Sequence, residues 1–139
     1  MSTVAVLVSR SGSAAAIGDL DAEEITVIGP DAAAYPVELR PLPLWIDRLR
    51  TLAWRTVLGR NLVRLSPFDD SRRLWNALRR DASIAAVVRD ADVVVAGDRD
   101  AVFSVWQMSR KSRTFGGGWA AVYGFAAAQW ALEVSRTKE

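Results

Sequence analysis

Two acidic residues, Asp98 and Asp100, follow the clearest strand pattern of the chain, the nearly continuous apolar run of residues 91–97. A carboxylate at the end of a buried strand can accept hydrogen bonds from ligand hydroxyl groups or act as a general base. Asp98 is therefore our candidate catalytic residue, with Gly97 and Asp100 as candidate substrate-binding residues beside it. The alternative is structural: Asp98 caps the next helix and Asp100 lies in its first turn.

A second set of candidates, Arg10, Ser11 and Gly12, follows the apolar run of residues 4–8. A guanidinium and the backbone N–H groups of a glycine-containing turn can bind an anion where a helix begins. These three residues are therefore further candidates for substrate binding. The segment lacks both the Gly-Lys-Ser/Thr ending of a P-loop and the Gly-x-Gly-x-x-Gly pattern, so an ordinary tight turn is the alternative.

The composition excludes several mechanisms, because the chain has no His and no Cys. Ser-His-Asp and Cys-His catalysis are impossible, and so is a disulfide framework. Asp98 and Asp100 alone supply too few oxygen ligands for a hard cation. We therefore predict no metal site and assign no cofactor.

Positive charge is concentrated in residues 40–80, which hold ten Arg against three acidic residues. Within this block, residues 44–64 repeat apolar side chains at helical spacing, and a basic amphipathic helix with Trp suits contact with an anionic membrane surface. The residues expected at that surface are Trp45, Arg48, Trp54, Arg55 and Arg60. The alternative is that the apolar stripe packs on the sheet and leaves the Arg side chains in water. Nucleic-acid binding is not expected, because Lys is scarce and no known binding motif is present.

The elements that must position these residues follow from the hydrophobic pattern. Residues 114–132 carry no charge and contain four glycines; they predict either a buried helix from Trp119, or a strand at 120–123 followed by a helix from Phe125. The pattern elsewhere predicts strands at 4–8, 24–28, 35–39 and 91–96, and helices at 44–64, 72–89 and from about residue 98.

This order of elements predicts an α/β fold: a single Rossmann-like domain over residues 1–139, with a small, mostly parallel sheet flanked by helices. Strands 4–8 and 91–96 should be parallel neighbours. Ligands bind at the carboxyl ends of such strands, which points to the loops at 9–13 and 97–100. The N-terminus does not have the pattern of a signal peptide, so a cytoplasmic protein is expected, with peripheral membrane association through the basic helix.

Three segments together resemble the N-terminal domain of GT-B glycosyltransferases, which use nucleotide-sugars. The resemblance is carried by the Arg- and Leu-rich helix of residues 72–78, by the strand and Asp-x-Asp turn of residues 90–101, and by the first strand and glycine-containing loop of residues 4–12. It implies an acceptor-side domain, because in that family a second domain holds most of the donor.

The chain departs from the family pattern at Val95 and Gly97, where the family has His. The isolated chain is therefore expected to transfer no sugar without a donor-binding domain or partner chain. The alternative function is a non-catalytic Rossmann-like binding or protein-interaction module, for example a homodimer formed through residues 119–132.

Overall fold

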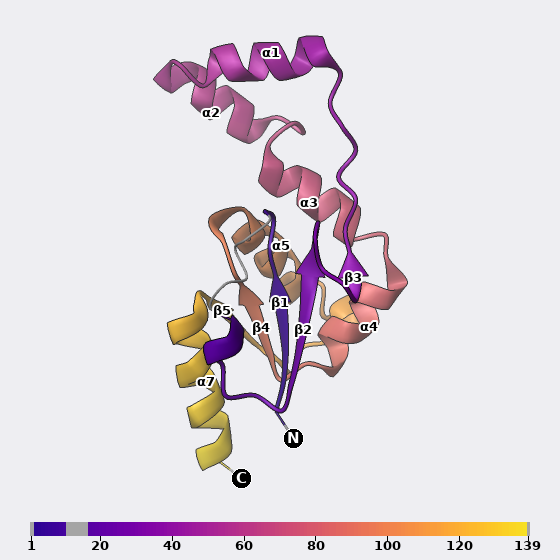
Figure 1. The fold of residues 1–139 in the computed structure, drawn as a ribbon, viewed down its shortest axis with the longest axis vertical. Coiled ribbons are helices and arrows are strands. Elements are labelled where there is room, and N and C mark those ends of the chain that lie inside the picture. The colour runs from indigo at the N-terminus through magenta and orange to yellow at the C-terminus, as the bar shows by residue number, and fades with distance from the viewer. Residues whose placement is uncertain (1, 11–16, 139) are drawn as a thin grey trace.

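The computed structural model describes residues 2–10 and 17–138, and its centre is a five-stranded, all-parallel sheet with helices on both faces (Figure 1). The strand order is β3-β2-β1-β4-β5. This confirms the predicted α/β, Rossmann-like architecture, and β1 and β4 are parallel neighbours as predicted. The strands are β1 (Thr3–Leu7), β2 (Glu24–Gly29), β3 (Tyr35–Pro36), β4 (Val93–Ala96) and β5 (Ala120–Tyr123).

The two central strands are apolar on both faces because helices cover both faces. In β1, Ala5 and Leu7 face one core cluster, while Val4 and Val6 face the other. The first cluster packs against α3, α4 and α5, and the second packs against α7. The helices are η1 (Ile17–Asp19), α1 (Leu44–Ala53), α2 (Val57–Leu65), α3 (Asp70–Leu78), α4 (Ala82–Asp90), α5 (Arg99–Arg110), α6 (Ser112–Phe115) and α7 (Phe125–Thr137).

Two predicted helices are each divided in two. The segment predicted as one helix at 72–89 breaks at Asp81, whose carboxylate accepts hydrogen bonds from the N–H groups of Ser83 and Ile84 and so starts α4. The segment predicted at 44–64 breaks before Thr56, whose hydroxyl accepts a hydrogen bond of 3.0 Å from the Gly59 N–H and starts α2. At each break an N-cap residue starts the next helix. Its side chain accepts hydrogen bonds from backbone N–H groups that have no other partner at a helix start.

The predicted strand at 35–39 is only two residues long, and its last bond to β2 runs from the Val37 N–H to the Gly29 carbonyl at 2.9 Å. The nitrogen of Pro36 points away from β2, which is the position that an edge strand allows for proline. The uncharged stretch at 114–132 contains β5 and the first part of α7, so the strand-then-helix alternative is confirmed and the single helix from Trp119 is wrong. Gly124 joins the two with a φ of 81°, a backbone conformation that favours glycine. No helix among the described residues is long and apolar enough to cross a membrane.

Helices α1 and α2 form a hairpin, residues 44–65, that projects beyond the carboxyl ends of the strands (Figure 1). None of the α1 residues is buried, and in α2 only Val63 is. The alternative expectation, in which the apolar stripe packs on the sheet, is therefore wrong. The stripe is instead left largely exposed on the hairpin.

Candidate functional site

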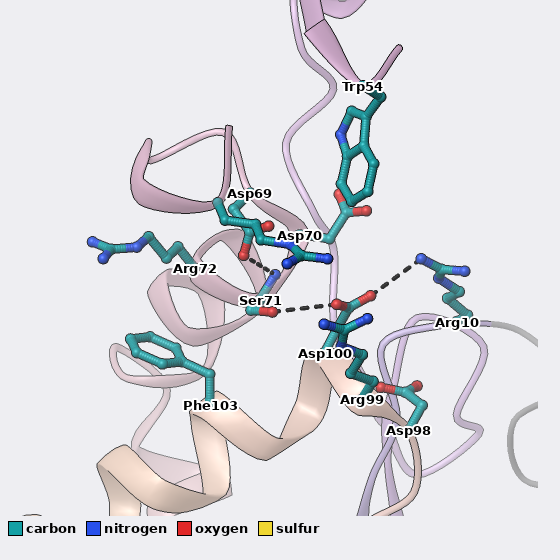
Figure 2. Close-up of a pocket in the computed structure, with 11 residues that line it drawn as sticks. Arg10, Trp54, Asp69, Asp70, Ser71, Arg72, Asp98, Arg99, Asp100 and Phe103 are labelled. Carbon is teal, nitrogen blue, oxygen red and sulfur yellow. Dashed lines mark hydrogen bonds and ion pairs between the residues drawn. The ribbon is translucent and has the colours of Figure 1, made fainter. Parts of the chain in front are cut away.

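An open cleft of about 640 Å³ lies at the carboxyl ends of β1 and β4 (Figure 2). Its floor is the start of α5, one wall is the start of α3, and residues of the hairpin approach from above. The residues that line it are Arg10, Trp54, Arg64, Asp69, Asp70, Ser71, Arg72, Asp98, Arg99, Asp100 and Phe103.

Asp98 joins the end of β1 to the start of α5. One carboxylate oxygen accepts a hydrogen bond from the Ser9 N–H at 2.6 Å, and the other accepts from the Ser9 hydroxyl at 2.9 Å and the Ala101 N–H at 3.0 Å. Asp98 therefore caps α5, as the structural alternative expected. A catalytic role for Asp98 stays a prediction, and it would have to act through oxygens that already hold three hydrogen bonds.

Asp100 lies at the centre of the cleft, and its carboxylate is held between two other elements. Arg10 approaches one oxygen at 3.2 Å, and the Ser71 hydroxyl donates to the other at 3.3 Å (Figure 2). Because the Arg10 side chain is 70 % exposed and that of Asp100 is 21 % exposed, a ligand can reach both groups. Asp100 is thus better placed than Asp98 to meet a hydroxyl group.

Asp69, which was not among the residues predicted from the sequence, adds a further carboxylate to the cleft beside Asp70, Asp98 and Asp100. Its side chain caps α3 by accepting a hydrogen bond of 3.2 Å from the Ser71 N–H. Burial raises the pKa of Asp69, and the nearby negative charge of Asp100 raises it further, while hydrogen bonding from Ser71 acts in the opposite direction. A carboxyl group in a cleft with a raised pKa is a candidate proton acceptor. In the sequence, Asp69 is recognisable only as an acidic residue before a helix, and helix capping alone explains an acidic residue at that position.

Guanidinium groups lie over aromatic rings at two places in the lining of the cleft. Arg64 lies over the Trp54 ring at 5.7 Å, and Arg72 lies over the Phe103 ring at 5.7 Å. Carboxylates accept hydrogen bonds from hydroxyl groups, guanidinium groups bind phosphate, and aromatic faces pack against apolar ring surfaces. The cleft can therefore hold a ligand that is rich in hydroxyl groups and carries an anionic group.

The remaining predicted site residues lie elsewhere. Ser11 and Gly12 fall outside the described residues. Gly97 does not line the cleft; a Cβ there would lie 2.8 Å from a Val8 methyl group, so its small size serves packing between β1 and β4. Of the residues predicted to meet an anionic surface, Trp54 lines the cleft. The other four, Trp45, Arg48, Arg55 and Arg60, lie outside it.

The position of the cleft agrees with a general rule for open parallel sheets. The chain leaves β1 toward β2 and β3 on one side, then crosses to β4 and β5 on the other, so the switch in direction lies between β1 and β4. Ligands bind at such switch points, outside the carboxyl ends of the strands. Comparisons of the chain with protein-family models, curated proteins and solved structures find no match, so a functional proposal depends on this geometry.

Proposed function

We propose that the chain is the acceptor-side domain of a glycosyltransferase-like enzyme, and that the cleft binds a hydroxyl-rich acceptor. One observation carries the proposal: Asp100 and Asp69, from the starts of two different helices, converge on an open cleft at the switch point of the sheet. Arginine residues surround the two carboxylates, so a phosphate on the acceptor or donor also finds partners.

In the proposed reaction, Asp100 accepts a hydrogen bond from the acceptor hydroxyl and orients it. The hydroxyl oxygen forms the new bond to the sugar, its proton passes to a carboxylate, and the nucleotide leaves with the electrons of the broken bond. Asp69 suits the proton-accepting role because its raised pKa brings it closer to neutral pH. The donor would be bound by a second domain or a partner chain.

Saturation-transfer NMR with alkyl glycosides below their micelle concentration tests whether the cleft binds an acceptor. We expect transfer to the sugar protons of at least one of the glucoside, galactoside and mannoside. Asp100→Asn should weaken it several-fold, because the neutral amide is a poorer acceptor and loses the Arg10 pair. Asp31→Asn, an exposed control, should leave binding unchanged. Equal binding by both variants, or none by the wild type, contradicts the proposal.

A second candidate function, the protein-interaction module, is favoured by the edge of β5, which pairs with no further strand among residues 2–10 and 17–138. In the register with β4, Ala120 and Val122 direct their backbone groups to β4, so those of Ala121 and Tyr123 point outward. Natural edges are usually blocked by charge, proline or shortness. The β3 edge has Pro36 and only two residues, whereas β5 is Ala-Ala-Val-Tyr and 60 % of Tyr123 is exposed.

A second copy could pair antiparallel with this edge, which would place Ala121 of each chain opposite Tyr123 of the other. Sedimentation velocity tests this directly. If the protein-interaction hypothesis holds, the wild type sediments as a dimer. Ala121→Lys should make it a monomer, because the two added charges then lie diagonally across the shared edge, about 7–8 Å apart. A monomeric wild type at high concentration removes this candidate.

A further inference from the structure

The hairpin exposes many large apolar side chains, and most of them do not line the cleft. Trp45 is 65 % exposed and Leu58 is 71 % exposed. Large exposed apolar patches in soluble proteins mark sites that contact a partner or a membrane. The other large apolar side chains exposed on the hairpin are Leu44, Leu49, Leu52, Trp54, Val57, Leu62 and Leu65.

Three of these side chains, Trp45, Leu49 and Leu62, line a groove between the two helices that has a volume of about 270 Å³. Apart from Arg50 and Ser66, every residue that lines it is apolar. The lining includes Trp45, Leu49, Ala53, Leu62, Val63 and Phe68. Trp45, Leu49 and Leu62 are exposed and also line this groove, so these three side chains lie on the same side of the hairpin.

Positive charge accompanies this apolar surface. Residues 44–65 contain five Arg and one acidic residue, Asp47. Arg50 pairs with Asp47 at 3.4 Å and with Asp70 at 2.8 Å, which anchors α1 to the start of α3. Among the described residues, Arg48, Arg55 and Arg60 form no ion pair, and all three are exposed.

We infer that the hairpin docks on an anionic lipid bilayer, with the apolar groove and its rim in the interface and Arg48, Arg55 and Arg60 on the headgroups. Amphipathic helices rich in Arg, Trp and Leu bind in this way. The charge argues against a second copy as the occupant, because two hairpins face to face would bring ten arginines together. Trp54 and Arg64 line the cleft from the hairpin, so docking would hold the cleft near the headgroups.

Co-sedimentation with vesicles tests the inference. Wild-type protein should pellet with vesicles of equal parts phosphatidylglycerol and phosphatidylcholine at low salt, and much less with phosphatidylcholine alone. Each Arg near an anionic surface gives roughly a fivefold gain in partitioning. Replacing Arg48, Arg55 and Arg60 with Glu should therefore lower the partition coefficient by at least about a hundredfold. Trp45→Ser with Leu49→Ser should remove the binding that persists at high salt.

A matched control changes the same charge on the body of the molecule: Arg79, Arg80 and Arg113, all exposed, are replaced with Glu. We expect this variant to keep most of its binding. If both charge variants lose the same share of vesicle binding, only the net charge matters and the proposed docking site is wrong. The proposed site is also wrong if the wild type stays in the supernatant with anionic vesicles. If the wild type is dimeric without lipid and the Trp45 and Leu49 changes make it monomeric, a second copy covers the groove and the inference is wrong. This test does not depend on sugar transfer.

Discussion

At the scale of single residues, two acidic side chains that look equivalent in the sequence have different surroundings in the structure. Asp98 and Asp100 are two positions apart, but Asp98 faces back to Ser9 and Ala101, whereas Asp100 faces the cleft. The difference arises because the first residue of the pair caps α5 and the second already lies in its first turn. The spacing indicated a polar strand end, but it could not indicate which carboxylate remains available.

Asp69 gives a prediction about pH. Its pKa is raised from 3.8 mainly by burial, so the folded protein holds this proton to a higher pH than the unfolded chain. Stability contributed by the protonated form is therefore lost as pH rises from about 4 through the folded-state pKa. Asp69→Asn keeps a capping side chain and removes the titration. Between about pH 3.5 and pH 7, the free energy of unfolding measured in urea should decline less for Asp69→Asn than for the wild type. Identical pH profiles would contradict the assignment.

A second residue-scale prediction concerns Ser104, which is completely buried on α5. Its hydroxyl oxygen has no hydrogen-bond partner in the part of the chain that the structure describes. A buried hydroxyl group without a partner costs about 1–3 kcal/mol. Ser104→Ala should therefore raise the free energy of unfolding by up to about 1 kcal/mol, since some lost packing offsets the gain. Urea unfolding at neutral pH measures this. A clear loss of stability would mean that the hydroxyl group is satisfied.

At the scale of elements, the sequence predicts strands well where both faces are apolar. Residues 4–8 and 91–96 are bracketed by turn signals and were found as β1 and β4, each within two residues of its predicted ends. The helices were harder, because the apolar repeat continues across Thr56 and Asp81 while the backbone does not. A single capping side chain decides those breaks, and the same residue types also occur on exposed helix faces.

Strand β4, next to the central strand β1, gives the element-scale prediction. Val94 lies in β4 and is fully buried between β1 and β5. Val94→Asp would place an unpaired carboxylate in the core and should cost several kcal/mol, on the order of 3–5. Ala121→Asp, on the exposed edge strand β5, is the control and should cost less than about 1 kcal/mol. If thermal melts show the same loss of stability for the two variants, β4 does not lie at the centre of the core.

At the scale of the whole molecule, the sheet order could be inferred only in part. The apolar runs indicated a parallel sheet and placed β1 beside β4, which locates the cleft. The exposure of the hairpin could not be inferred, because an amphipathic repeat such as that of residues 44–64 looks the same whether it packs on the sheet or stays free. Likewise, Asp69, Ser71 and Arg64 come from segments whose approach to Asp100 depends on tertiary structure.

The whole molecule also sets an expectation for activity. If the chain supplies only the acceptor side, the purified protein should form no product from common nucleotide-sugars and alkyl glycosides, because donor binding would then depend on another domain or chain. Mass spectrometry of the reaction mixture measures this. Turnover by the pure chain that Asp98→Asn abolishes would show that the chain is a complete enzyme and that Asp98 is catalytic.

The most direct test of the cleft as an acceptor site is amide chemical-shift mapping of the full chain during titration with the glycoside that binds best. We expect the chemical-shift changes to be grouped at the starts of α3 and α5, around Ser71 and Asp100, with smaller changes at Trp54 on the hairpin. The same titration of Asp100→Asn should leave these signals nearly unmoved. Shifts confined to the β5 edge or to the groove of the hairpin, with none around Asp100, would contradict the proposed acceptor site.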